Sequence, residues 1–130
     1  MRKPIYSVSI LLIYLYAAAC QPITQPAEVS TEAGQALFRR VVLGGAAGCS
    51  TCHSLEPGVV MVGPSLAGIG ESAANRVEDL SAEVYLRQSI EEPDIYLAVG
   101  FPSGVMPKTF KENLSQVEID SLVAYLMTLK

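Results

Sequence analysis

The clearest hydrophobic pattern lies at the C-terminal end, in LSQVEIDSLVAYLMTLK (114–130). Apolar side chains recur there at three- and four-residue intervals and so share one face of a helix: Ile119, Leu122, Val123, Leu126 and Leu129. Ser115 suits an N-cap, and Glu118 three residues later completes a capping box. The pattern predicts an amphipathic helix over 115–129.

A second helical pattern occurs in EAGQALFRRVVL (32–43), where two apolar pairs stand four residues apart. The pairs are Leu37 with Val41 and Phe38 with Val42. Two glycines at 44 and 45 should end this helix and form a flexible connection.

A third helix is predicted over SAEVYLRQSIEE (81–92), because Pro93 should stop it. No strand-like alternation is visible anywhere in the chain. The fold class is therefore all-α, with three or more helices. The loops at 54–80 and 94–113 are longer than a compact domain usually contains, which suggests that they pack around a large cofactor.

The N-terminal residues, MRKPIYSVSILLIYLYAAAC, have the layout of a secretory signal. Arg2 and Lys3 precede an apolar run from Ile5 to Ala19. That run is shorter than the roughly 20 residues that a membrane-spanning helix needs. We expect a signal peptide over 1–19; the alternative is a retained membrane anchor.

The sequence AAAC resembles the lipobox of bacterial lipoproteins, although Ala17 stands where leucine is usual. The resemblance implies that Cys20 is lipidated and anchors the chain on the outer, periplasmic face of the cytoplasmic membrane. The alternative is a free thiol at Cys20. Residues 20–31 are rich in proline and glutamine and are expected to be a tether, followed by one domain over 32–130.

The net charge of the chain bears on the class of partner it can bind. Without residues 1–19 the chain keeps seven basic residues against 13 acidic ones, a net charge of about −6. An acidic domain without a basic stripe argues against nucleic acid as a partner.

The chemistry-bearing residues are concentrated in CSTCH, where Cys49, Cys52 and His53 include the single histidine of the chain. A structural zinc site needs four ligands, and no second cysteine pair is available. A thiol–disulfide centre expects a βαβ setting that the sequence lacks. Cys-x-x-Cys-His is the attachment signature of haem c. One helical turn puts both thiols on one side for the haem vinyl groups and lets the imidazole reach the iron. We therefore favour haem c.

A single histidine rules out two histidine ligands, so a sixth ligand must be of another type. Methionine is the common alternative. Met106 lies in the Gly/Pro-rich loop GFPSGVMPKTF (100–110) and is the favoured ligand. Met61 follows His53 too closely, and Met127 belongs to the C-terminal helix. The alternative is an open sixth position, as in a haem enzyme or a gas sensor.

The chain resembles the class I c-type cytochromes over residues 32–130. The resemblance is carried by CSTCH, GPSLAGI (63–69), GVMP (104–107) and IDSLVAYLMTL (119–129). It implies that helices and long loops wrap one haem and that Gly34 and Phe38 meet Leu122 and Tyr125. It also implies that the Pro64 carbonyl orients His53 and that Leu66 lies against the haem face.

The same resemblance implies a one-electron carrier that is not an enzyme and has no small-molecule substrate. Residues 89–107 are similar to cytochrome c domains that serve membrane respiratory oxidases, and to the monohaem lipoprotein subunit of alternative complex III. The expected partners are membrane-bound electron donor and acceptor complexes of a respiratory or photosynthetic chain. Four side chains are candidates for binding the haem propionates: Arg76, Arg87, Tyr85 and Tyr96. Lys108 and Lys111 are candidates for a positive rim.

Overall fold

The computed structural model describes residues 28–130, so the expected signal peptide, Cys20 and most of the expected tether lie outside the described residues. The elements in chain order are α2 (Thr31–Phe38), β1 (Val42–Leu43), β2 (Ala46–Ala47), α3 (Cys49–Cys52), α4 (Ile69–Ser72), the 3-10 turn η1 (Ala73–Asn75), α5 (Ala82–Glu91), α6 (Phe110–Asn113) and α7 (Gln116–Leu126). The predicted all-α class is confirmed. Within 28–130 no helix has the length and hydropathy of a membrane span.

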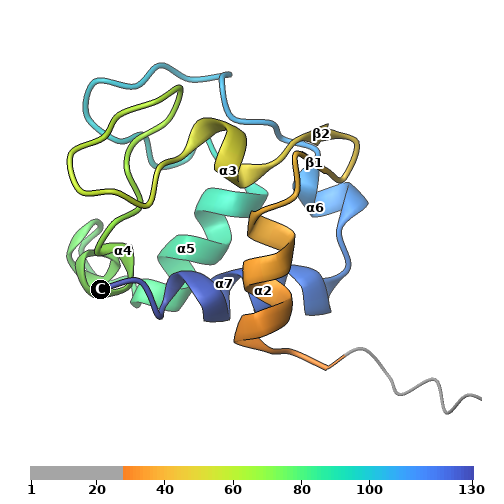
Figure 1. The fold of residues 1–130 in the computed structure, drawn as a ribbon. Helices are drawn as coiled ribbons and strands as arrows, with labels where there is room; N and C mark the ends of the chain where they lie inside the picture. The colour runs from red at the N-terminus through yellow and green to blue at the C-terminus, as the bar shows by residue number, and fades with distance from the viewer. Residues whose placement is uncertain (1–27) are drawn as a thin grey trace, which may run out of the picture.

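Helix α7 forms the base of the domain, as its hydrophobic pattern predicted (Figure 1). The predicted capping box is confirmed: the Ser115 hydroxyl accepts the Glu118 N–H at 3.3 Å, and the Glu118 carboxylate accepts the Ser115 N–H at 2.8 Å. Ile119 and Leu122 are 0% and 1% exposed. Leu129 lies beyond the end of the helix and is only partly buried, although it still packs against the core.

Helix α2 crosses α7, and this is the most extensive contact between any two described elements (Figure 1). The crossing depends on Gly34, because a Cβ there would lie 1.9 Å from the Ser121 carbonyl oxygen. Beside it the rings of Phe38 and Tyr125 pack with centroids 5.6 Å apart. The helix begins at Thr31, and the Ser30 N–H donates to the Ser121 hydroxyl at 3.3 Å. Residues 30 and 31 therefore belong to the domain and not to the tether.

The predicted helix over 32–43 is wrong in its second half, because α2 ends at Phe38. Val41 and Val42 are 72% and 64% exposed, so the proposed pairs with Leu37 and Phe38 do not form an apolar stripe. β-Branched residues favour extended backbone over helix. The chain accordingly leaves the helix before these two valines.

The segment that follows is a small antiparallel hairpin, which the sequence analysis did not predict. Val42 pairs with Ala47 and Leu43 with Ala46. Gly44 and Gly45 both have positive φ, 54° and 78°, as a two-residue hairpin turn requires. The two glycines therefore make a tight turn and not a flexible connection. The turn sends Leu43 into the core at 2% exposure.

Helix α5 occupies the predicted range, with Ser81 as its N-cap and the buried Pro93 just beyond its C-cap. Leu86 and Ile90 face the core, whereas Val84 is 41% exposed. The two long connections are shorter than predicted. The first contains α4 and η1, and the second ends in α6.

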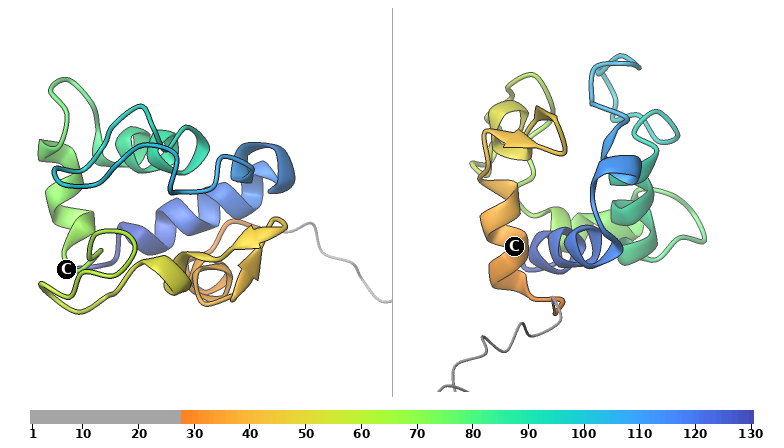
Figure 2. Two further views of the ribbon diagram at one scale, coloured as in Figure 1. Left: turned by 90° about the horizontal axis from the view of Figure 1, so that it is seen from above. Right: turned by 90° about the vertical axis from the view of Figure 1, so that its right-hand side faces the viewer.

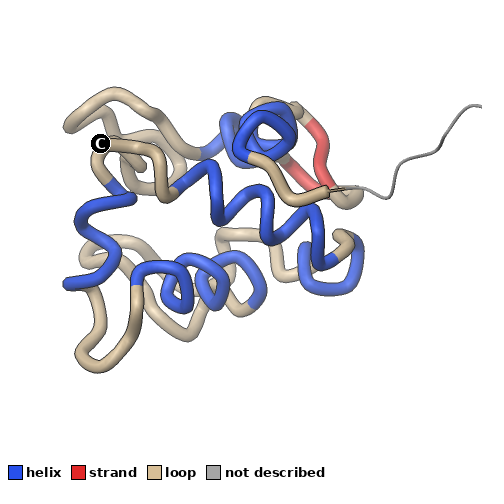
Figure 3. Tube along the Cα trace, turned by 90° about the horizontal axis from the view of Figure 1, so that it is seen from below, coloured by secondary structure: helices blue, strands red, loops and turns tan. Residues whose placement is uncertain are grey.

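The elements stand on two sides of α7. Figures 2 and 3 show α2, the hairpin and α3 on one side, and α5, α6 and the loop before α6 on the other. The two sides meet through the core along α7. A cavity lies between the two sides.

Candidate haem site

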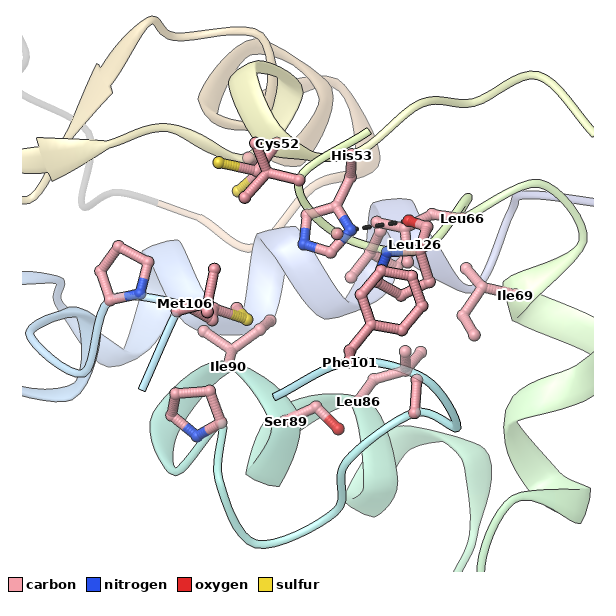
Figure 4. Close-up of a pocket in the computed structure, with 18 of the residues that line it drawn as sticks. Cys52, His53, Leu66, Ile69, Leu86, Ser89, Ile90, Phe101, Met106 and Leu126 are labelled. Carbon is pink, nitrogen blue, oxygen red and sulfur yellow. Dashed lines mark hydrogen bonds between the residues drawn. The ribbon is translucent and has the colours of Figure 1, made fainter. Parts of the chain in front are cut away.

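A largely apolar cavity lies between the two sides of the domain (Figure 4). Its walls come from α2, the segment through α3, residues 62–66, α5, the loop 93–107 and α7. Apolar side chains dominate the lining, among them Phe38, Leu66, Leu86, Ile90, Phe101 and Leu126. Cys52 and His53 lie on one wall, and Met106 lies on the wall opposite (Figure 4). Cys49, on the same helical turn as Cys52, also lines the cavity.

The cysteine wall is built by one short helical turn. Gly48 precedes α3, and its N–H donates to the Val41 carbonyl at 2.8 Å. A Cβ on Gly48 would lie 1.8 Å from the Arg40 carbonyl oxygen, so only glycine brings the chain this close. Cys49 and Cys52 are half-buried and are not joined by a disulfide. Both cysteines line the cavity from this single helical turn.

His53 follows α3 and is held by the segment that returns beneath it. Its Nδ1 lies 2.8 Å from the Pro64 carbonyl oxygen (Figure 4). A carbonyl can only accept, so Nδ1 carries the proton, and in the neutral ring Nε2 is the nitrogen that holds the lone pair. A Cβ on Gly63 would lie 2.4 Å from Cε1 of the ring, so the backbone closely supports the imidazole. The structure thus shows the Pro64–His53 contact, and the role of Pro64 in a haem pocket stays a prediction.

Met106 is the one methionine among residues 28–130 that lines the cavity. It is partly buried and packs against the core. Met61 is 46% exposed, and neither it nor Met127 lines the cavity. The thioether of Met106 and the ring of His53 thus face one space from opposite sides (Figure 4).

The lining suits a haem. Its largely apolar walls would exclude water from such a ring, and Leu66 and Pro64 supply part of them on the histidine side. Ser89 of α5 also lines the cavity, and its hydroxyl oxygen is buried without a hydrogen-bond partner in the described part of the chain. A buried hydroxyl without a partner is unusual, and a polar edge of a bound group would satisfy it.

The alternatives to haem fit less well. Within the described residues no three His, Cys, Asp or Glu side chains cluster as a metal ion would require. Burial raises the pKa of the Cys49 thiol to about 11. Reactive thiols of redox centres instead have lowered pKa values.

The candidates for haem propionates divide into two groups. Arg76, Tyr85 and Tyr96 line the cavity, and the two tyrosine rings pack with centroids 5.9 Å apart. The structure contradicts the expectation for Arg87. It does not line the cavity, because its guanidinium pairs with Asp120 and Glu91.

For Lys108 and Lys111 the structure favours ordinary paired surface lysines over a positive rim. Lys108 lies 2.5 Å from a carboxylate oxygen of Asp94, and Lys111 lies 2.7 Å from one of Glu92. Each lysine is therefore neutralised by an acidic partner.

Two residues of the site, Ser89 and Asp94, were not predicted from the sequence. Ser89 shares a helix face with Leu86, three residues earlier, and that spacing was a usable signal. Asp94 lines the cavity and contacts the loop that carries Met106. No local pattern pointed to that contact.

Fold and site together define a haem-binding electron-transfer protein of small, helical type. A family model described as cytochrome c matches residues 31–130. The chain is 30% identical over 87 residues to cytochrome c2 iso-2 of Magnetospirillum fulvum, covering 62% of this chain and 91% of that relative. The chain belongs to the cytochrome c family. The expected class I c-type cytochrome and its haem c are thereby confirmed, and Cys49 and Cys52 have the spacing for covalent attachment.

Proposed function

We propose that this electron carrier holds one haem through Cys49 and Cys52, that His53 and Met106 bind the iron, and that it serves a membrane electron-transfer chain. The observation that carries the ligand assignment is the approach of His53 and Met106 to one cavity from opposite walls. The haem supplies a one-electron Fe(III)/Fe(II) couple, and a methionine ligand raises its potential.

The protein's own residues prepare the site before any electron moves. The Pro64 carbonyl fixes the proton of His53 on Nδ1, so Nε2 can bind iron without losing a proton. The apolar walls exclude water and lower the local dielectric, which affects the potential of a bound redox centre. No binding position for a substrate is needed in this role.

Carbon monoxide binding to the ferrous holoprotein tests the sixth ligand. We expect the native protein to bind the gas poorly and Met106→Ala to bind it readily, because the ligand position is then open. Met61→Ala is the matched control, since Met61 is 46% exposed and does not line the cavity. Native protein that binds the gas as readily as Met106→Ala would support the haem enzyme or gas sensor instead.

The partner is proposed to dock over two exposed apolar loops beside the cavity. These loops form what we call the apolar rim: Val59, Val60, Met61, Val62, Ile95, Leu97, Val99 and Val105. Three of its members, Val62, Leu97 and Val105, also line the cavity, so the rim is continuous with the haem site. The nearby Lys108 and Asp94 neutralise each other.

An uncharged apolar rim fits the uncharged apolar face of a membrane-bound redox protein. Electrostatic steering makes association strongly dependent on ionic strength, and a neutral contact lacks this dependence. We expect electron transfer with native membranes to change little with salt. Val60→Lys and Val99→Lys should slow it, whereas Val41→Lys, outside the rim and 72% exposed, should not. A steep salt dependence in the native protein would contradict this docking mode.

The membrane location is proposed from the signal-like residues 1–19 and the lipobox-like AAAC before the domain. Lipid on Cys20 would hold the domain at the periplasmic surface. We expect Cys20→Ser to move the cytochrome from the membrane fraction to the soluble fraction, and mass spectrometry to find the lipid on the native N-terminus. Native electrophoresis after gentle solubilisation then separates a mobile carrier from a subunit of a larger complex, such as alternative complex III.

A further inference from the structure

The loop that carries Met106 has little support from its own backbone. Within the described chain no backbone–backbone hydrogen bond involves residues 102–108. A thioether is a weak ligand, so its apparent affinity for iron depends on how often the loop presents it correctly. Something other than secondary structure must hold this loop.

Asp94 makes two contacts that bracket Met106. Its Oδ1 accepts the Gly104 N–H at 2.8 Å, two residues before the methionine. Its Oδ2 lies 2.5 Å from Nζ of Lys108, two residues after it. One carboxylate therefore ties down both flanks of the ligand segment.

Asp94 is itself fixed to the frame of the domain. It follows the buried Pro93 at the end of α5, and the Ile95 N–H donates to the Glu92 carbonyl at 2.9 Å. Gly104 reaches the carboxylate through a left-handed backbone, with φ of 77°, that glycine adopts without strain. The contacts with Lys108 and the Gly104 N–H lower the pKa of Asp94 and favour its charged form.

We propose that Asp94, through Gly104 and Lys108, is a positioning residue that holds Met106 against the haem iron. We call these three residues the Asp94 clasp. The proposal rests on the proposed role of Met106 as a ligand. The clasp stabilises the ordered loop, so removing it lowers the fraction of time that the thioether occupies the iron.

The neighbouring ion pair supplies a matched control. Glu92 and Lys111 also join the end of α5 to α6, just beyond the loop, at 2.7 Å, and their side chains are 53% and 52% exposed. Neither is within two residues of Met106. Glu92→Gln therefore removes a nearby lysine-paired carboxylate charge without releasing the ligand segment.

The test uses the full-length holoprotein. We measure carbon monoxide affinity in the ferrous state, the long-wavelength absorption band of thioether-bound ferric haem, and the reduction potential. We expect Asp94→Ala to raise the gas affinity about two- to fivefold, because the contacts of Asp94 are solvent-exposed and such contacts contribute modestly. The absorption band should weaken and the potential should fall.

Two further variants separate the arms of the clasp. Asp94→Asn keeps an oxygen for the Gly104 N–H and should give an intermediate effect. Lys108→Met keeps the carboxylate with Gly104 and should also be intermediate. Glu92→Gln should match the native protein in all three measurements.

Each failure has its own signature. If Asp94→Ala, Asp94→Asn and Lys108→Met all behave like Glu92→Gln while Met106→Ala opens the iron, the clasp is wrong and the ligand assignment stands. If Met106→Ala leaves gas binding and the absorption band as in the native protein, Met106 is not the ligand, and both proposals fall.

Discussion

The crossing of α2 and α7 at Gly34 is a close backbone contact between two helices of this cytochrome. We predict that Gly34→Ala destabilises the protein, although alanine is the better helix former. The added Cβ would lie 1.9 Å from the Ser121 carbonyl oxygen and 2.5 Å from its carbonyl carbon. Both atoms are backbone, so neither can rotate away. The helices must separate by more than 1 Å to restore an ordinary contact.

The expected loss follows from three contributions. Overpacking a tight core costs about 1–3 kcal/mol, and a backbone clash belongs at the upper end. Separating the helices also weakens the Phe38–Tyr125 pair, worth about 0.5–1.5 kcal/mol. Replacing glycine inside a helix returns about 1 kcal/mol. The net loss is about 3 kcal/mol. For a domain of this size that lowers Tm by roughly 12–24 °C.

Thermal unfolding of the holoprotein at neutral pH, followed by circular dichroism and by the haem absorption, measures this change. Ala36→Gly is the control, because Ala36 is an exposed residue of the same helix. It should lose only the propensity difference of about 1 kcal/mol. A Gly34→Ala protein as stable as the native one, or more stable, would refute the close-packed crossing.

Two other predictions concern the histidine and the acid stability of α7. Gly63→Ala should displace the His53 ring, because the new Cβ would lie 2.4 Å from Cε1. We expect absorption spectroscopy to show more high-spin ferric haem. An unchanged low-spin spectrum would contradict the support of the ring by Gly63. The Ser115 backbone N–H, with the Ser115 hydroxyl, lowers the pKa of Glu118. This contribution to the free energy of unfolding is present above the unfolded pKa, near 4.3, and is lost as pH falls through the lower folded value. Glu118→Gln should therefore flatten the decline in stability below about pH 4, and a slope equal to that of the native protein would show that the capping box does not couple to pH.

Some features of this protein could be predicted from the sequence because residues close together in the chain form them. The capping box of Ser115 and Glu118 involves neighbours three residues apart, so no distant part of the chain is needed to form it. The same holds for Cys49, Cys52 and His53, which one helical turn and its cap bring together. Residues that close in sequence have few alternative arrangements.

Competition between local preferences explains the errors near α2. The spacing of Leu37 with Val41 favoured a helix, whereas β-branched residues before two glycines favoured a hairpin. The hairpin formed because it buries Leu43 at 2% exposure, a gain that comes from the core and not from the neighbours. Arg87 was misassigned for a related reason. Its partner Asp120 lies on α7, and only the packing of α5 on α7 brings them together.

By itself the sequence determined the chemistry of attachment, because two thiols and one imidazole stand at the spacing of haem c. It also showed which residues cap the helices. Because the chain has a single histidine, the sequence also excluded a second histidine of this chain as the sixth ligand and favoured a methionine. The tertiary structure decided which methionine faces the cavity and which cations are already paired. It also decided which carboxylate grips the loop of Met106. Those outcomes depend on contacts between elements far apart in the chain, and such contacts exist only once α2, α5 and α7 have packed.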